Sequence, residues 1–484
     1  MSRKLVALYM ALSLLLGASG TYLGLQFLDN DQSSSNQGFI SDGGDTATSD
    51  ESTAKDFEKI QNAYELIAGR YVEEIDQDQL IEGAIKGMVD TLEDPYSVYM
   101  DKDTATQFTQ SLDSSFEGIG AEVSMVEGKV TIVAPFKDSP AEKSGLKPND
   151  QIIKIDGESI EGLDLYEAVL KIRGEKGTTV TLDVMRPGVN NVMNIEVVRD
   201  EIPIETVYSS VKEYNGKKVG YIEITSFAEK TAADFEAKLA ELEKEDIEGL
   251  ILDVRGNPGG LLDSVEQILK QLVTKEKPYV QIEQRDGNKQ RFFSTLEQKK
   301  DYPITVLINE GSASASEILA GALKEAGGYE VVGDTSFGKG TVQQAVPMED
   351  GSNIKLTMFK WLTPDGNWIH ETGVEPTIPV KQPDYFYSNP IQLEDELVLD
   401  MNNEKIKNAQ LMLKGLGFEP GREDGYFSKE TETAVKAFQQ ANDLNVNGKI
   451  NAETANKIES EILEHVRDEN NDLQLKTAIK ILFQ

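Results

Sequence analysis

The chain has 484 residues, of which 39% are hydrophobic and 27% are charged, a composition typical of soluble globular domains with an ample core. Its 48 basic and 84 acidic residues give a formal net charge of −36, which argues against nucleic-acid binding because phosphate contacts need a basic face. There are no cysteines and only two histidines, His370 and His465, so thiol catalysis, disulfides, zinc–thiolate sites and histidine-rich metal sites are excluded.

The N-terminus carries an uncharged run, LVALYMALSLLLGASGTYLGLQFL, at residues 5–28. As a helix it would be about 36 Å long, enough to cross the hydrocarbon core of a bilayer. Arg3 and Lys4 would stay on the cytoplasmic side, so we expect the rest of the chain to be extracytoplasmic. The triplets GAS and ASG also suit signal-peptide cleavage. Residues 1–28 are therefore either a single-pass membrane anchor or a signal segment whose removal gives a secreted protein.

The next part of the chain changes from polar to patterned sequence. Residues 29–53 are polar and predict a disordered linker. Residues 54–112 carry apolar residues at helical spacing, with a second helix in QLIEGAIKGMVDTL, and predict a helical N-terminal region. Residues 113–198 alternate short strand-like and helical runs with glycine-rich turns, which indicates a separate small module.

The larger second half begins with strands that alternate with helices over residues 199–388, which predicts a sheet covered on both faces. Residues 389–463 contain two turn signals, EDG and VNG, each followed by a helix start with Ser428 or Asn451 as candidate cap. Residues 464–484 end in a short helix with an apolar face.

Three serines alternate with small residues in NEGSASASEI, residues 309–318: Ser312, Ser314 and Ser316. An apolar strand-like run precedes them and an alanine-rich helical run follows. A strand–turn–helix junction can expose a hydroxyl and aim the first free N–H groups of the helix at one point, which suits a nucleophile. The alternative is that the small residues simply cap the helix and pack closely.

Lys339 lies between two glycines in GDTSFGKGTVQQ, near apolar segments, which is unusual for a solvated charge. Because histidine is scarce, a Ser–Lys pair is the remaining option for a general base. The amine must be neutral, and burial without a counter-ion lowers the pKa of a lysine. Gln343 could orient the amine without raising its pKa. A lysine that binds phosphate or carboxylate is the alternative, although a P-loop is not matched because Gly340 replaces its Ser or Thr.

The run DVRGNPGG, residues 253–260, follows an apolar strand and precedes a helix. Gly259 and Gly260 would let backbone N–H groups approach a substrate closely, as an oxyanion hole requires. An ordinary strand–helix turn is the alternative.

RGNPGG, GSASASE and FGKGTVQQ, in that order, resemble the carboxyl-terminal processing peptidases, also called tail-specific serine proteases. The resemblance covers about residues 54–388 and includes LEDPYSVYM and GVEPTIPV. The family's catalytic serine is the middle one of such a run, and no metal or cofactor is needed. The implied roles are nucleophile for Ser314, general base for Lys339, orienting partner for Gln343, and oxyanion donors for the N–H groups of Ala315 and of Gly259 or Gly260.

Residues 113–198 resemble a PDZ domain, because SPAEKSGLKPNDQIIKIDG matches that pattern. The resemblance implies that GIGAEV binds a peptide's terminal carboxylate and adds the peptide as an extra strand. Arg173, after the module's helix, could couple peptide occupancy to the catalytic loop, or it could be a plain surface arginine. The peptide-binding residues implied are Gly118, Ile119, Gly120, Ala121 and Arg173.

Residues 389–463 resemble a peptidoglycan-binding module in LMLKGLGF, DGYFSKETETAVKAFQQANDL and VNGKINAETANKI. Peptidoglycan is thus an expected partner, although such modules also serve as spacers. The module would then be inserted before a terminal helix that belongs to the core. Thr377 replaces an aspartate of the family motif that precedes it, which we do not expect to affect catalysis.

The predicted architecture is multidomain, combining α/β and α+β parts: an N-terminal membrane helix, a helical region, a PDZ domain, an α/β Ser–Lys peptidase core and a small helical peptidoglycan-binding-like domain. The predicted function is an exported serine endopeptidase that recognises C-terminal tails of protein substrates. The alternative is a non-catalytic, wall-associated PDZ scaffold. A peptidoglycan hydrolase is a second rival, whose metal-dependent forms lack histidine and cysteine ligands here. Family members often dimerise through terminal helices, so a homodimer is expected. For His370 we expect a structural or surface role.

Overall fold

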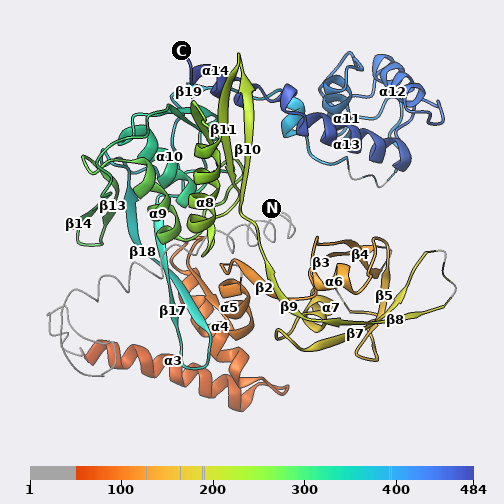
Figure 1. Cartoon of the computed structure of the whole chain (residues 1–484). Helices are drawn as coiled ribbons and strands as arrows, with labels where there is room; N and C mark the ends of the chain where they lie inside the picture. Colours follow the sequence, from red (N-terminus) through yellow and green to blue (C-terminus); the bar gives the residue numbers. More distant parts are fainter. Residues whose placement is uncertain are drawn as a thin grey trace.

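The computed structural model describes residues 51–484, apart from the single residues 111, 127, 164, 188, 190, 392 and 394. Figure 1 shows the arrangement, with the α/β core, the small antiparallel module and the C-terminal helical domain as separate bodies along the chain. Within these residues, no helix combines the length and the apolar character that a membrane span requires. The predicted membrane or signal segment, residues 1–28, lies outside them.

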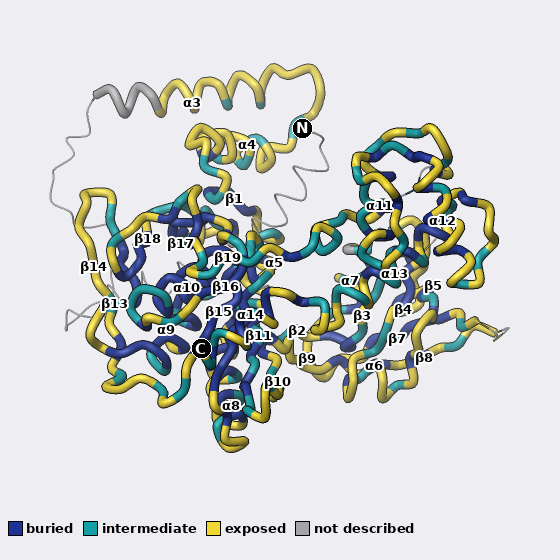
Figure 2. The backbone as a smooth tube through the Cα atoms, turned by 90° about the horizontal axis from the view of Figure 1, so that it is seen from above, coloured by how far each residue is buried: buried dark blue, intermediate teal, exposed yellow. Residues whose placement is uncertain are grey.

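The N-terminal region is helical, as its apolar spacing predicted. Its first helix among the described residues, Glu51–Arg70, includes residues 51–53 of the predicted linker 29–53. Phe57 and Val72 are largely exposed, and Figure 2 shows this helix lying away from the buried core. The elements are α3 (Glu51–Arg70), α4 (Gln77–Asp90), β1 (Val98–Met100) and α5 (Lys102–Gln110).

The next module is a small antiparallel sheet of order β3-β4-β5-β7-β8, with β6 beside β5 and two helices. Its strands alternate buried and exposed side chains, most clearly in β7, and the buried ones form a core of their own. A two-stranded ribbon, β2 with β9, connects it to the rest of the chain. The elements are β2 (Ser115–Gly118), β3 (Ala121–Val126), β4 (Lys129–Pro135), α6 (Pro140–Lys143), β5 (Gln151–Ile155), β6 (Glu158–Ser159), α7 (Leu165–Ile172), β7 (Thr179–Met185), β8 (Met193–Val198) and β9 (Asp200–Pro203).

The α/β core is built on a six-stranded sheet of order β10-β11-β12-β15-β16-β19, parallel except for the β10–β11 pair. Every residue of β12 and β15 is buried, because helices cover both faces. Leu250 and Leu252 pack with α8, α9 and α10, whereas Ile251 packs with the C-terminal helix α14. The elements are β10 (Val207–Tyr214), β11 (Lys217–Ile224), α8 (Thr231–Lys244), β12 (Gly249–Asp253), α9 (Leu262–Leu272), β15 (Ile304–Ile308), α10 (Ala315–Glu325), β16 (Glu330–Gly333), β19 (Ile378–Pro379) and α14 (Leu473–Ile481).

A second sheet joins the N-terminal region to the core. Its order is β1-β18-β13-β14, with β17 also paired to β18, so β1 from the N-terminal region extends a sheet whose other strands belong to the core. Val98 of β1 pairs with Lys355 of β18, which pairs on its other side with Ala345 of β17. The elements are β13 (Pro278–Glu283), β14 (Lys289–Phe293), β17 (Thr341–Pro347) and β18 (Asn353–Leu362).

The C-terminal helical domain follows β19. Ser428 and Asn451 cap their helices by accepting the N–H groups of Thr431 and Thr454, as predicted. Its last helix continues to Arg467, past the predicted boundary at 463, because its apolar face goes on packing against the domain core. The chain then returns to the core sheet through α14. The elements are η2 (Asp384–Tyr387), α11 (Glu404–Gly415), α12 (Lys429–Ala441), α13 (Ala452–Arg467) and η3 (Glu469–Asn471).

Candidate active site

Ser312 and Ser314 lie between the end of β15 and the start of α10, Ser316 is the second residue of α10, and only the middle serine is left for chemistry. The Ser312 hydroxyl donates to the carbonyl of Val254 at 2.7 Å, and the Ser316 hydroxyl donates to the carbonyl of Asn257 at 2.9 Å. Both serines are fully buried. The outer serines therefore fix the turn against the loop that follows β12, while Ser314 stands at the N-terminus of α10.

The backbone of Ser314 is strained. Its φ is 54° and its ψ is −112°, in a region that residues with a side chain rarely adopt. Such outliers cost on the order of 1–3 kcal/mol and persist where the surroundings enforce them, typically at functional sites. A sharp turn from strand to helix that carries a serine is the arrangement by which α/β-hydrolases present a nucleophile.

Lys339 lies in the loop between β16 and β17 and is fully buried. The two glycines beside it are needed because residues 369–373 cross the loop closely. A Cβ on Gly338 would lie 3.0 Å from the N of Gly373, and one on Gly340 would lie 2.7 Å from the N of His370. The glycines thus let a second chain segment cover the lysine and exclude water from it.

The surroundings of Lys339 favour its neutral form. Burial is the main cause that lowers its pKa well below the ordinary value, and the positive charge of Lys355 lowers it further. Glu317 and Asp94 act in the opposite direction and do not reverse the effect. The Lys339 amine also lies 4.9 Å from the ring centre of Tyr96, from the N-terminal region.

Glu317 connects the serine turn to the lysine loop, and sequence reasoning gave it no role. Its Oε2 accepts the N–H of Ser314 and the N–H of Lys339, each at 2.8 Å. Its Oε1 accepts the Ser336 hydroxyl and the N–H of Gly338, each at 2.6 Å. Burial raises the pKa of Glu317, and these hydrogen bonds oppose the rise. The readable signal was the spacing Ser-x-x-Glu at a helix start, which is typical of a capping box.

Gln343 is buried on β17, on the strand that follows the lysine loop. Its Nε2 donates to the hydroxyls of Thr341 and Thr357, each at 3.0 Å. Among the described residues, its Oε1 is a buried acceptor with no hydrogen-bond partner. A buried carbonyl oxygen of this kind can accept a bond from an amine or from a substrate N–H.

The glycines of RGNPGG lie beside the serine turn. A Cβ on Gly259 would be 2.9 Å from the Cβ of Ser314 and 3.1 Å from the N of Ala315, so only glycine leaves this space open. A Cβ on Gly260 would be 2.2 Å from the carbonyl oxygen of Phe227. The N–H of Gly259 donates to Oδ1 of Asn257 at 2.8 Å and is thus engaged inside the loop.

The two remaining oxyanion candidates are the N–H groups of Ala315 and Gly260. Ala315 is the first residue of α10, where backbone N–H groups have no partner within the helix. Asn257, which the sequence did not single out, holds the two turns together: its carbonyl accepts the N–H of Ala313 at 3.0 Å, and its Nδ2 donates to the carbonyl of Ile224 at 2.8 Å.

The predicted peptide site of the small module lies at the start of β3, which is an edge strand of its sheet. Gly118 ends β2, Ile119 and Gly120 form the connection, and Ala121 begins β3. Gly120 has a φ of 72°, and a Cβ there would lie 2.6 Å from the Cβ of Ser139. An edge strand next to a glycine loop can pair with an added peptide strand.

Arg173 lies next to the ribbon that connects this module to the rest of the chain. Its guanidinium is 4.8 Å from the ring centre of Phe116 on β2.

His370, for which the sequence predicted a structural or surface role, accepts the N–H of Gly340 at 3.3 Å and stacks on Trp368. The contacts of His370 support the segment that covers Lys339.

The chain matches four known families along its length. The family matches are "Activating protease CtpB N-terminal domain" at residues 14–104, "PDZ domain" at 118–197, "Peptidase family S41" at 218–380 and "Putative peptidoglycan binding domain" at 402–458.

Whole-chain relatives agree with these matches. The carboxy-terminal processing protease CtpB of Bacillus subtilis (strain 168) is 59% identical over 483 residues, covering 100% of both chains. The carboxy-terminal processing protease CtpA of the same organism is 42% identical, covering 88% of this chain and 90% of that protein. A Staphylococcus aureus (strain COL) protein named "Probable CtpA-like serine protease" is 38% identical, covering 88% of this chain and 84% of that protein.

Proposed function

Because this chain belongs to the carboxy-terminal processing proteases of peptidase family S41, we propose that it cleaves proteins with a Ser314–Lys339 dyad. The observation that carries the proposal is that Ser314 and Lys339 donate their N–H groups to one oxygen of Glu317. A single buried carboxylate thereby fixes the turn that carries Ser314 and the loop that carries Lys339 relative to each other.

In this mechanism the Ser314 hydroxyl oxygen attacks the scissile carbonyl carbon, and its proton passes to the neutral amine of Lys339. The N–H groups of Ala315 and Gly260 stabilise the oxyanion. Lys339 returns the proton to the leaving amine as the C–N bond breaks, which leaves an acyl-enzyme. Water then attacks the acyl carbon and gives a proton to Lys339, which passes that proton to the Ser314 oxygen as the ester C–O bond breaks. The product acid ionises to a carboxylate in solvent. The buried Oε1 of Gln343, an acceptor without a hydrogen-bond partner among the described residues, supports a role in orienting the amine.

The dyad is tested by turnover of an unfolded model protein with a free C-terminus. We expect cleavage by the full-length protein and none by Ser314→Ala. Absence of cleavage by the wild type under every condition, together with retained binding of the same protein, would favour the alternative of a non-catalytic PDZ scaffold.

Recognition of C-terminal tails is assigned to the PDZ domain, at Gly118, Ile119, Gly120 and Ala121. The edge position of β3 and the glycine loop before it support this assignment. Arg173, which contacts the connecting ribbon, is proposed to transmit peptide occupancy to the core. Two peptides that differ only in a free or an amidated C-terminus provide the test: we expect the free acid to bind and the amide to bind at least about tenfold more weakly. Equal binding would remove the role of the carboxylate.

Location and assembly are further parts of the proposal. The uncharged run at residues 5–28 supports an extracytoplasmic protein that is anchored to the membrane or released by cleavage. Exposed apolar side chains on and after α3, including Phe57, Leu66 and Val72, support a homodimer formed through this region. Protease accessibility on intact cells tests the location. Sedimentation of the purified protein tests the homodimer. Co-sedimentation with purified cell wall tests peptidoglycan binding.

A further inference from the structure

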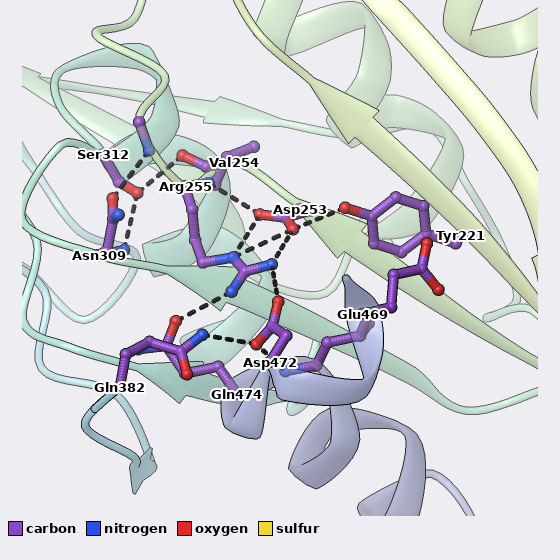
Figure 3. A network of polar contacts seen from close by, with 12 residues as sticks. Tyr221, Asp253, Val254, Arg255, Asn309, Ser312, Gln382, Glu469, Asp472 and Gln474 are labelled. Carbon is purple, nitrogen blue, oxygen red and sulfur yellow. Dashed lines mark hydrogen bonds and ion pairs between the residues drawn. The ribbon is translucent and has the colours of Figure 1, made fainter. Parts of the chain in front are cut away.

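Arg255 lies just after β12, at the start of the loop that carries Gly259 and Gly260, and it is almost enclosed by polar partners (Figure 3). Its Nη2 lies 2.6 Å from Oδ2 of Asp253 and 2.8 Å from Oδ2 of Asp472. Its Nη1 donates to Oε1 of Gln474 at 3.0 Å. The side chains of Asp253 and Asp472 are only 4% and 12% exposed, so the guanidinium is held in a largely dry site by two carboxylates.

Asp472 and Gln474 come from the segment that follows the helical domain, and that segment also binds the chain that enters the domain. Oδ1 of Asp472 accepts Nε2 of Gln382 at 2.6 Å, and the N–H of Leu473 donates back to Oε1 of Gln382 at 3.1 Å. Gln474 donates to Oδ2 of Asp334 at 3.0 Å. The two connections of the peptidoglycan-binding-like domain therefore meet at Gln382 and Asp472, and Asp472 in turn contacts Arg255.

On its other side, Arg255 is continuous with the candidate oxyanion loop. Its own N–H donates to Oδ1 of Asp253 at 3.0 Å, and the hydroxyl of Tyr221 donates to Oδ2 of Asp253 at 2.8 Å. The N–H of the next residue, Gly256, donates to Oδ1 of Asn309 at 2.8 Å, on the loop that leads to the serine turn. Asp472 thus bonds Arg255, and the neighbours of Arg255 in the chain, Val254 and Gly256, bond Ser312 and Asn309 of the segment that leads to Ser314. Figure 3 shows the bonds of Asp472 to Arg255 and of Val254 to Ser312.

We propose that Asp472 is a positioning residue, which holds Arg255 and through it the oxyanion loop, so that the segment after the helical domain completes the active site. The inference rests on the proposed Ser–Lys mechanism. Burial opposes the charge of Asp472, but its bonds to Arg255 hold the pKa of this carboxyl below its usual range. Asp472 is therefore a charged partner of Arg255 at neutral pH, beside Asp253.

The substitution Asp472→Asn isolates this contact in the full-length protein. Oδ1 of Asp472 also caps α14 by accepting the N–H of Leu475 at 2.8 Å, and asparagine caps helices as well as aspartate does. An asparagine therefore keeps the bonds made by Oδ1 and replaces Oδ2 by an NH₂ group that faces the donors of Arg255. The matched control is Glu469→Gln, three residues earlier, which removes the 2.6 Å ion pair to Lys212 and leaves Arg255 untouched.

We expect Asp472→Asn to lower kcat by about tenfold or more while KM changes by less than about twofold, because an oxyanion contact acts in the transition state. Affinity for a peptidyl aldehyde inhibitor should fall in parallel with kcat, whereas binding of a free-acid tail peptide to the PDZ domain should not change. Asp472→Glu should recover part of the lost kcat, and Glu469→Gln should behave as wild type.

Two results would overturn the inference: an Asp472→Asn variant that turns over at the wild-type rate, or an equal loss of kcat in Glu469→Gln, which would mean that any disturbance of this segment suffices. A wild-type protein that neither cleaves nor binds the aldehyde would instead overturn the proposed mechanism itself, and the two failures are thereby separated.

Discussion

Ser314 and Lys339 donate their backbone N–H groups to the same atom, Oε2 of Glu317, each at 2.8 Å. The nucleophile turn and the base loop are thus held by one carboxylate that is buried in helix α10. This relationship makes Glu317 the residue whose loss should uncouple the two halves of the site.

Glu317→Gln should strongly reduce catalysis and also reduce stability. Its NH₂ group would replace one acceptor oxygen and face two N–H donors, which leaves buried donors without partners at a cost of about 1–3 kcal/mol each. We expect lower kcat and a lower free energy of unfolding, measured by peptide cleavage and by urea denaturation. Glu310→Gln is the control, since it removes an exposed carboxylate four residues before the nucleophile. Normal kcat in Glu317→Gln would contradict the assigned role.

The pH dependence of activity should report the amine of Lys339. Burial lowers its pKa well below the ordinary value, so the neutral base is present above that lowered pKa and is lost as the pH falls through it. Activity should therefore persist below the ordinary pKa of lysine and decline as the pH falls through the lowered pKa. A profile that rises only near the ordinary pKa of lysine would contradict this account.

Lys355→Met should move that acidic limb to higher pH. Lys355 is buried, and its positive charge lowers the pKa of Lys339, so its removal lets that pKa rise. Burial also lowers the pKa of Lys355 itself to about 8, so the effect should be confined to pH values below that point. The measurement is kcat/KM against pH, with the exposed Lys360→Met on the same strand as control. Superimposable profiles for Lys355→Met and wild type would remove this electrostatic coupling.

Ser314→Gly should be more stable than Ser314→Ala, although both are inactive. Glycine adopts the positive φ of this position freely, whereas alanine keeps the strain. Allowing for the greater flexibility of glycine in the unfolded chain, we expect a difference of about 1 kcal/mol in the free energy of unfolding. Equal stability of the two variants would show that the turn stores no strain.

Gly259→Ala should reduce activity far more than Gly256→Ala. Both glycines have positive φ, but a Cβ at 259 would be 2.9 Å from the Cβ of Ser314, whereas one at 256 would meet nothing within 4 Å. We expect a loss of kcat of about tenfold or more for Gly259→Ala and near-normal kcat for Gly256→Ala. Both variants should also lose stability, because alanine is strained at a positive φ. Similar kcat values would mean that the space beside the nucleophile is not used.

Local patterns in the sequence were enough to predict that Ser314 lies at a strand–turn–helix junction, that Lys339 is not a solvated surface charge, and that Ser428 and Asn451 cap helices. Each of these features depends on neighbouring residues. The sequence also predicted a helix that returns to the core after the inserted domain. It did not predict that the N–H of Gly259 is engaged by Asn257, because that bond depends on how the loop closes.

Contacts between segments that are distant in the chain could not be predicted from the sequence. Asp472 meets Arg255, and Tyr96 meets Lys339, only because the fold brings separate parts of the chain to one place. Glu317 is an intermediate case: the capping-box spacing was visible, but three of its four hydrogen-bond donors, at Ser336, Gly338 and Lys339, come from another loop.

The most direct test of the Ser–Lys mechanism is the site and the pH dependence of covalent labelling by a fluorophosphonate, followed by peptide mass mapping of the full-length protein. We predict a single adduct on Ser314, formed more slowly as the pH falls, and none in Ser314→Ala or Lys339→Met. An adduct on another serine, or labelling of Lys339→Met at the wild-type rate, would contradict it.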